Sequence, residues 1–147
     1  MMFTQGTLIY FTPFYFSDGS FKNKYFLILE NTGNDIIVAS LPTSKDHIPN
    51  SIIKNHGCIS DDSMKVSCYF FQKNKIISEC GTFGFPENTY IYGEQLCFFN
   101  LKLLQSAYKN KGKDYEVKCK LSNTELESVK KCLKNSGVVA RKFKKFL

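Results

Sequence analysis

Three apolar runs close to the start of the chain limit the fold more than any other feature of the sequence. Each run is short and rich in β-branched or aromatic residues, which is typical of buried strands. The pattern predicts strands over Thr7–Phe11, Tyr25–Leu29 and Ile36–Leu41. Pro13 lacks the N–H that a central strand donates, so the first strand is expected to end there, before a loop of about ten residues. A tight hairpin at Thr32–Asn34 joins the other two strands.

The remaining chain contains further strand signals and two helix signals. A polar, irregular segment over 43–62 is a candidate substrate loop, because long loops in small domains often carry function. We predict a second hairpin, with strands over 65–71 and 75–78 joined by a turn at 73–74, and a strand over 89–99. A short helix over Leu101–Lys109 and an edge strand over Tyr115–Leu121 are expected to follow. Gly93 is expected to bend or bulge the longest of these strands.

The strongest helix signal lies near the C-terminus. Ser122 is a candidate N-cap, and Glu125 follows three positions later, where its carboxylate completes a capping box. Leu126, Val129 and Leu133 then recur at helical spacing and form one apolar stripe. These signals predict a helix over roughly 122–136.

Together the elements predict one α+β domain over residues 1–147. A chain of this length can bury a sizeable core. Short strands followed by late helices favour a small, strongly bent antiparallel β-barrel with C-terminal helices. The barrel is expected over roughly 6–100 and 115–121, and the helices over roughly 101–110 and 122–136.

Positive charge is concentrated in the last third of the chain. The formal net charge is +7, and residues 101–147 hold thirteen of the twenty basic residues but only four of the thirteen acidic ones. Such asymmetry suggests either a polyanion or acidic protein as partner, or a solvated basic face. Charge alone leaves both interpretations open.

The N-terminus and the cysteines suggest a compartment. The first apolar run has no basic segment before it and is broken by Pro13, so neither a signal peptide nor a membrane span is expected. We therefore predict a cytoplasmic protein. In the cytoplasm the six irregularly spaced cysteines are expected to be reduced and buried as small apolar residues.

Two other uses of cysteine are weighed against the spacing. His56, Cys58, Cys68 and Cys80 supply four nitrogen and sulfur ligands, but their spacings match no common zinc motif. A nucleophilic pair of Cys58 and His56 has little support, because the fold and not sequence adjacency assembles such pairs. We predict neither a metal site nor a cofactor.

Several short motifs occur in an order that points to a known family. They are a glycine before the first strand, a loop with Pro-Phe and Asp-Gly, a basic residue before an apolar strand, and a strand that ends in Pro-Thr-Ser. The matching positions are Gly6, Pro13–Phe14, Asp18–Gly19, Lys24, Phe26–Leu29 and Pro42–Ser44. In this combination the chain resembles the MazF/PemK family of toxin endoribonucleases. Gly93–Leu96 and Leu121–Lys134 extend the resemblance more faintly to a later strand and the C-terminal helix.

The resemblance implies an SH3-like barrel and a metal-independent endoribonuclease that cleaves single-stranded RNA as the toxin of a toxin–antitoxin pair. It also implies a homodimer, and an antitoxin protein that covers the RNA groove. Family members are understood to use an Arg at the start of the second strand and a Thr or Ser at the end of the third. Those catalytic positions are Lys24 and Thr43 here, with Ser44 beside them, and Tyr25 replaces the usual Pro. Lysine cannot offer a bidentate fork to a phosphate, so the exchange puts catalysis in question.

One histidine and one aromatic loop add candidates to this site. His47, four residues after Thr43, is a nearby side chain suited to proton transfer near neutral pH, although a surface-loop histidine is the alternative. Aromatic faces beside lysines suit stacking on single-stranded bases, unless the rings belong to the core. The RNA-binding candidates are Phe14, Tyr15, Phe16, Phe21, Lys22 and Lys45.

Two other functions compete with the nuclease. The same small barrel can bind nucleic acid or an acidic protein without catalysis, which the Lys24 exchange favours. A third hypothesis is an interaction protein whose aromatic surface holds a partner helix. Such a complex resists salt, whereas phosphate binding weakens steeply as salt is added.

Overall fold

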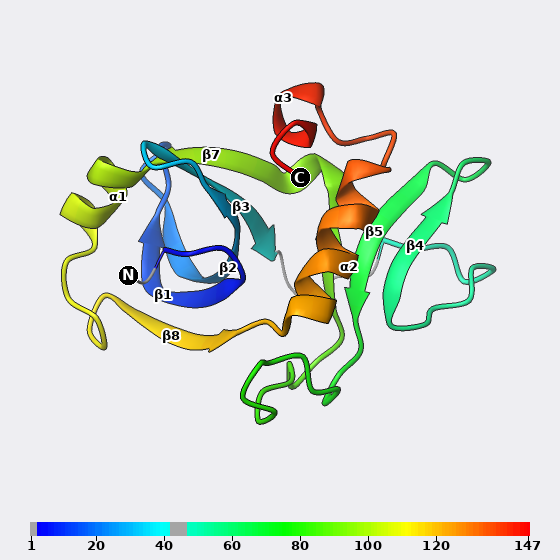
Figure 1. The fold of residues 1–147 in the computed structure, drawn as a ribbon, viewed down its shortest axis with the longest axis horizontal. Helices are drawn as coiled ribbons and strands as arrows, with labels where there is room; N and C mark the ends of the chain where they lie inside the picture. Colours follow the sequence, from blue (N-terminus) through cyan, green and yellow to red (C-terminus); the bar gives the residue numbers. More distant parts are fainter. Residues whose placement is uncertain (1–2, 42–46) are drawn as a thin grey trace.

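The computed structural model describes residues 3–41 and 47–147 of the chain. Within these residues the strands form two antiparallel sheets, one of five strands and one of three, and most of the helical structure comes late in the sequence. The predicted α+β class is therefore confirmed. Figure 1 shows one helix, α2 (Asn123–Lys134), lying between the two sheets.

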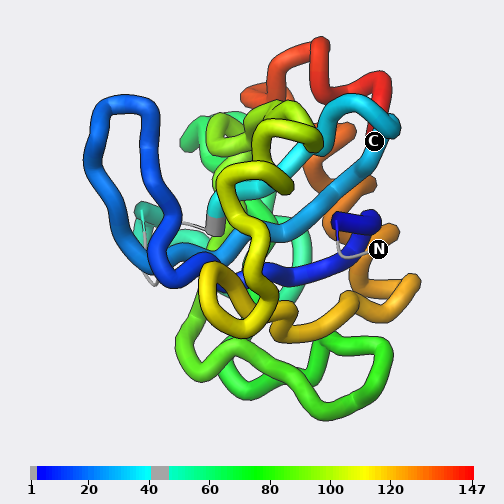
Figure 2. The backbone as a smooth tube through the Cα atoms, turned by 90° about the vertical axis from the view of Figure 1, so that its left-hand side faces the viewer, coloured from blue at the N-terminus to red at the C-terminus, as the bar shows by residue number. Residues whose placement is uncertain are grey.

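The five-stranded sheet is built around the N-terminal hairpin. β1 (Thr7–Tyr15) pairs with β2 (Phe21–Asn31), and β2 pairs with β3 (Asp35–Leu41), as the three apolar runs predict. β7 (Leu96–Asn100) lies beside β3, and β8 (Tyr115–Lys120) lies beside β1 as the predicted edge strand. Figure 2 shows that the end of the β1–β2 hairpin extends away from the rest of the chain.

The first strand does not end at Pro13, as the sequence had predicted. It continues to Tyr15 through a cis Thr12–Pro13 peptide bond, and its pairing with β2 shifts register between Phe11 and Phe14. An irregularity of this kind tolerates a proline, because the ladder does not need its N–H there. The loop that follows is consequently shorter than expected, and the hairpin is longer.

The three-stranded sheet corrects two further predictions. It contains β4 (Gly57–Asp61), β5 (Val66–Phe71) and β6 (Thr89–Tyr92), in that order. β4 falls inside the segment that was expected to be irregular. Residues 75–78 do not pair with β5, because β4 and β6 occupy both of its edges; Ser78 instead bridges to Leu121.

A short 3-10 turn carries the chain from the small sheet into the large one. This turn, η1 (Gly93–Gln95), connects β6 to β7, so the predicted interruption at Gly93 is confirmed, as a helical turn and not a bulge. A Cβ at Gly93 would lie 2.6 Å from Cγ2 of Val138. Only glycine allows this close approach without a shift of its neighbours.

The predicted C-terminal helix is present as α2, and its N-cap forms as expected. Ser122 Oγ accepts a hydrogen bond from the backbone N–H of Glu125 at 3.2 Å. The apolar stripe of α2 is buried in the main core, together with side chains of both sheets. The other helices are α1 (Leu101–Ala107), which was also predicted, and α3 (Arg141–Lys144). No helix in the described part of the chain is long and apolar enough to span a membrane.

Candidate functional site

The end of the β1–β2 hairpin carries two exposed aromatic rings. Tyr15 and Phe21 pair across the two strands, with exposed fractions of 62% and 65% and ring centroids 5.7 Å apart. Asp18 orders the turn between them, because its Oδ1 accepts hydrogen bonds from N of Ser20 at 2.8 Å and from Oγ of Ser20 at 2.6 Å. These bonds lower the pKa of Asp18. The hairpin thus presents the two rings to solvent on an ordered turn.

A basic hollow lies beside this turn. It has a volume of about 350 Å³ and is lined by Phe16, Ser17, Asp18, Ser20, Lys22 and Lys24. Lys22 and Lys24 are two residues apart on β2 and therefore point to the same face. The ammonium of Lys24 lies 5.6 Å from the ring centroid of Phe16. Partial burial, and then repulsion from Lys22, lower the pKa of Lys24.

A larger aromatic hollow lies between the hairpin, β7 and α1. Its volume is about 590 Å³, and the rings of Phe14, Phe26, Phe99 and Tyr108 form much of its wall. The hydroxyl of Tyr108 accepts a hydrogen bond from the backbone N–H of Tyr15 at 2.9 Å. This bond ties the end of the hairpin to the end of α1.

The basic and aromatic hollows are neighbours that share part of their wall. Phe16 and Ser17 line both of them. Cys97 lines the aromatic hollow, where burial raises the pKa of its thiol to about 11 and keeps it neutral at physiological pH. The combined surface therefore offers cations at one end and uncharged walls rich in aromatic rings at the other.

Most of the RNA-binding candidates from the sequence lie around these hollows, in different environments. Lys22 and Phe16 line the basic hollow, together with Lys24, the catalytic position that the resemblance implies. Phe14 is only 5% exposed, because it packs in the core against Phe11 and other rings, and it contributes a wall and little free surface. Tyr15 and Phe21, by contrast, are the exposed pair at the hairpin end.

The other predicted site residues are not seen in this group. The backbone N–H of His47 donates to the hydroxyl of Tyr92 at 3.0 Å, and the two ring centroids lie 5.4 Å apart. His47 is therefore held against β6, a strand of the small sheet. Outside the described residues lie Thr43, Ser44 and Lys45.

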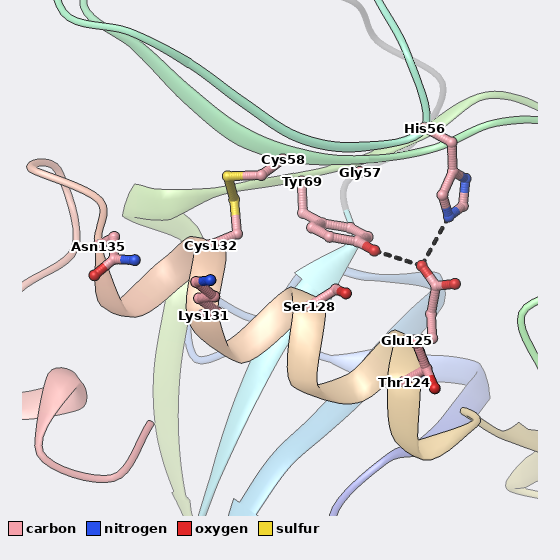
Figure 3. A pocket seen from close by; sticks show the side chains of 10 residues that line it. All are labelled: His56, Gly57, Cys58, Tyr69, Thr124, Glu125, Ser128, Lys131, Cys132 and Asn135. Atoms are coloured by element: carbon pink, nitrogen blue, oxygen red, sulfur yellow. Dashed lines mark hydrogen bonds and ion pairs between the residues drawn. A yellow bond between two sulfur atoms is a disulfide. The ribbon is translucent and has the colours of Figure 1, made fainter.

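A second constellation lies between α2 and the small sheet (Figure 3). Glu125 of α2 accepts two hydrogen bonds at the same carboxylate oxygen, from Nε2 of His56 at 2.7 Å and from the hydroxyl of Tyr69 at 2.5 Å. The other ring nitrogen of His56, Nδ1, accepts the backbone N–H of Gln72 at 3.0 Å. Because Nδ1 is an acceptor, the imidazole carries its proton on Nε2 and donates it to the carboxylate.

This polar cluster is largely shielded from water. The side chains of His56 and Glu125 are 8% and 12% exposed, and Tyr69 is buried. Burial, followed by the hydrogen bond to Glu125, raises the pKa of Tyr69. Buried polar groups that bond one another strengthen an interface, so the cluster fixes the first turn of α2 on the small sheet.

The cluster forms one end of a cavity of about 440 Å³, which we call the helix cavity. At the other end a disulfide between Cys58 and Cys132 joins β4 to α2, with Ser128 between the two ends (Figure 3). The prediction of six reduced cysteines is therefore wrong for this pair. The two cysteines are 74 residues apart in the chain, and only the packing of α2 on β4 brings them together.

The disulfide also bears on the other uses weighed for the cysteines. Cys58 has no free thiol with which to act as a nucleophile beside His56. Cys68 is buried, and Cys80 is exposed with its sulfur bonded to the hydroxyls of Thr82 and Ser78. Those hydroxyls, Thr82 first, lower the pKa of Cys80 to about 7.

Sequence reasoning missed Glu125 as part of a site because it assigned the carboxylate to a capping box. Only half of that box forms: Ser122 accepts the N–H of Glu125, while the carboxylate turns away to His56 and Tyr69. The one sequence signal was an acidic residue at the start of a helix, which caps far more often than it binds a distant histidine.

No protein-family model, no curated protein and no solved structure matches this chain. Inference about its function therefore starts from its own residues and from the resemblance of its motifs.

Proposed function

We propose that this chain is a diverged relative of the MazF/PemK toxins that binds single-stranded RNA across the basic and aromatic hollows and cleaves it without a metal. The observation that carries the proposal is the shared wall of the two hollows, formed by Phe16 and Ser17. A phosphate held by Lys22 and Lys24 has its neighbouring base within reach of an aromatic surface. Sites for single-stranded nucleic acid combine these same two elements.

The charges and rings at the hairpin are available to a ligand. Neither Lys22 nor Lys24 has an ion-pair partner among residues 3–41 and 47–147. Tyr15 and Phe21 expose most of their surface at the hairpin end. A base stacked on such a ring contributes about 1–3 kcal/mol of binding free energy, whatever its identity.

The catalytic part of the proposal rests on the resemblance. Cleavage without a metal requires deprotonation of the 2′-hydroxyl, stabilisation of the phosphorane and protonation of the 5′-oxygen. Lys24 stabilises the phosphorane in this proposal. Tyr25 pairs with Leu41, so Lys24 lies at the end of the sheet from which the chain continues toward Thr43.

Thr43 is the second catalytic position that the resemblance implies, and Ser44 is the hydroxyl beside it. Lys45 is a further phosphate contact, and His47 transfers a proton. The same resemblance supplies the setting of the proposal: an SH3-like barrel made by the two sheets, a homodimer and an antitoxin partner. The proposed cytoplasmic location comes from the N-terminal sequence.

Binding without cleavage is the second candidate function. Lys24 stands where the family has Arg, and its partly buried amine offers a single point charge to a phosphate. The carboxylate that lines the basic hollow, Asp18, already accepts two hydrogen bonds from Ser20. It is therefore a poor general base, which favours a binding module over a nuclease.

One experiment tests both candidates. Long, mixed-sequence single-stranded RNA is incubated in EDTA with wild-type protein, Lys24→Ala, Thr43→Ala and the control Lys73→Ala. Lys73 is an exposed lysine that lines neither hollow. If the chain is a nuclease, wild-type protein and Lys73→Ala produce discrete fragments with cyclic-phosphate ends, whereas Lys24→Ala and Thr43→Ala produce none.

The other outcomes are equally informative. Intact RNA in every reaction, with binding by the wild type that Lys24→Ala weakens and Lys73→Ala does not, supports the binding module and overturns the nuclease. If the folded wild type neither cleaves nor binds RNA, both candidates fall.

A further inference from the structure

We propose that the Cys58–Cys132 disulfide is a thiol–disulfide exchange site for a dithiol reductant, and that its reduction loosens the chain that leads into β4 while the fold persists. Both cysteines line the helix cavity, so the bond faces a space of about 440 Å³ (Figure 3). Cys58 is exposed, whereas Cys132 is 4% exposed. Cys58 is therefore the sulfur that is open to an incoming thiolate.

The interface around the disulfide does not depend on it alone. In the first turn of α2, Glu125 bonds to His56 and Tyr69. Beyond the other end of the helix, Oγ of Ser67 donates to Oγ of Ser136 at 2.6 Å. The apolar stripe of α2 is buried in the main core as well. Opening the disulfide thus removes one covalent link from an interface that keeps its packing and its polar contacts.

The exchange is a balanced two-electron reaction. One thiolate of the reductant attacks Sγ of Cys58, the S–S bond breaks, and Cys132 leaves as a thiolate. The second thiol of the reductant is then deprotonated and attacks the mixed disulfide, which releases Cys58. The reductant becomes a disulfide, and the two protons that its thiols lose are balanced by protonation of the Cys58 and Cys132 thiolates.

The charge of the helix cavity suits this chemistry. Lys131 lines the cavity next to Cys132 in the chain, and its ammonium attracts an incoming thiolate and stabilises a departing one. Glu125 carries the opposite charge, but it lies at the other end of the cavity and is bonded to His56 and Tyr69 (Figure 3).

Reduction acts on the segment that leads into β4. His56 and Cys58 attach this segment to α2 from nearly adjacent positions, one through a hydrogen bond and one through the disulfide. Farther back, His47 is attached to β6 through its backbone. With the disulfide open, the segment loses its covalent link to α2 and keeps non-covalent contacts, among them the bond of His56, the buried side chain of Ile48 and the pairing of β4 with β5, so its backbone amides are expected to exchange faster over 47–61.

The first test labels thiols in the folded protein. The Cys80→Ser variant is used, because Cys80 is the only fully exposed free thiol of the described residues. Protein is treated with dithiothreitol without denaturant, quenched with N-ethylmaleimide and mapped by peptide mass spectrometry. Cys58 is expected to be labelled, whereas Cys68, Cys119 and the released Cys132, each at most 9% exposed, react far more slowly in the folded protein. Labelling of all four at one rate, or of none, overturns the proposal, since reduction then requires unfolding.

A second test examines the role of charge at the cavity. Lys131→Gln is expected to slow the first attack by glutathione, an anionic monothiol of which a second molecule completes the reduction, about two- to fivefold at low salt. Lys134→Gln is the matched control, since Lys134 is an exposed lysine of the same helix that does not line the cavity. Equal rates for the two variants contradict the assignment of Lys131.

Hydrogen exchange measures the structural consequence. Reduced and oxidised protein are compared by mass spectrometry, and deuterium uptake is expected to rise over 47–61 and to stay the same in β1, β2 and β3. Unchanged uptake over 47–61 overturns the loosening of the segment. None of these measurements uses RNA, so their outcome is independent of the proposed nuclease.

Discussion

The hairpin end and the helix cavity differ in what their polar groups are bonded to. At the hairpin, Lys24 contacts a ring and has no ion-pair partner within the described chain, and Tyr15 and Phe21 are exposed. In the helix cavity, Glu125 and His56 bond each other and are mostly buried. One region keeps free charge and free aromatic surface, whereas in the other Glu125 is already bonded to His56 and Tyr69.

Because of this difference, we expect RNA binding and folding stability to depend on different residues. A solvated lysine or an exposed ring contributes little to folding and remains available to a ligand. A buried carboxylate that accepts two hydrogen bonds is costly to remove, because its donors are left without partners. Substitutions at the hairpin end should therefore change RNA binding with little change in stability, and substitutions in the helix cavity should do the reverse.

The largest expected effect is on the free energy of unfolding, and it distinguishes two adjacent aromatic residues of the hairpin. Phe14→Ala is expected to lower the free energy of unfolding by about 3–5 kcal/mol, because it removes a buried ring and leaves a void. Phe14 is 5% exposed and packs against Phe11 and Phe26. Tyr15→Ala is expected to cost less than about 1 kcal/mol, since that ring is exposed. Urea unfolding of the oxidised protein, followed by circular dichroism, measures both.

RNA binding, unlike stability, should depend on the exposed ring of Tyr15. Tyr15→Ala is expected to weaken binding to single-stranded RNA by about 1–3 kcal/mol, which is the contribution of one stacked base. Similar unfolding energies for Phe14→Ala and Tyr15→Ala would show that the hairpin end is not divided into a core side and a free side.

Local patterns were sufficient to predict the hairpin region and α2. Apolar runs bounded by turn residues specify strands whose partners are close in the chain, as with β1, β2 and β3. The basic hollow was only partly predictable, because the sequence placed Phe16 and Lys22 in the loop before the predicted second strand, whereas β2 begins at Phe21 and carries Lys22 and Lys24 on one face. The error at Pro13 came from a register shift, which local propensity does not report.

The helix cavity was not predictable, because long-range contacts build it. His56 and Glu125 are 69 residues apart, and Cys58 and Cys132 are 74 residues apart. No periodicity in a single sequence indicates which helix will pack on which strand. The five-residue strand β4 escaped prediction in the same way, because its pairing with β5 and its packing on α2 stabilise a segment with weak local signals.

Removal of Glu125 is expected to have the next largest effect. Glu125→Ala leaves the Nε2–H of His56 and the O–H of Tyr69 without their acceptor in a mostly buried site. The expected loss is about 2–4 kcal/mol in the free energy of unfolding. Glu127→Ala is the matched control, since Glu127 is exposed on the same helix, and it should change stability by less than about 0.5 kcal/mol. Urea unfolding with the disulfide intact compares them.

A second substitution separates the charge of Glu125 from its shape. Glu125→Gln keeps a carbonyl oxygen that accepts hydrogen bonds but loses the negative charge, so an intermediate loss of stability is expected. RNA affinity should be unchanged in every folded variant of this position. Equal stability of Glu125→Ala and Glu127→Ala, or a loss of RNA affinity in Glu125→Ala alone, would contradict the division between the two regions.

The smallest effect tests whether RNA uses the charge of Lys24. Burial, helped by the nearby Lys22, lowers the pKa of Lys24 below its ordinary value of 10.5. As the pH rises, Lys24 therefore loses its proton before a fully solvated lysine does, while RNA phosphates stay charged. Affinity is expected to fall on the alkaline side of neutrality. In Lys24→Arg the guanidinium stays charged, so this fall should move to higher pH.

Salt dependence separates this charge from other effects of pH on the protein. Loss of one phosphate contact reduces the slope of log affinity against log salt by about 0.7 for single strands. The wild-type slope should approach that of Lys24→Ala as the pH rises, and the control Lys73→Ala, which retains Lys24, should follow the wild type, whereas Lys24→Arg should keep its slope to higher pH. Nuclear magnetic resonance of ¹³C-labelled lysine locates the pH range in which Lys24 deprotonates. A wild-type slope that stays constant across that range would show that the RNA phosphates bind elsewhere, and would contradict the assignment of the hairpin as the binding region.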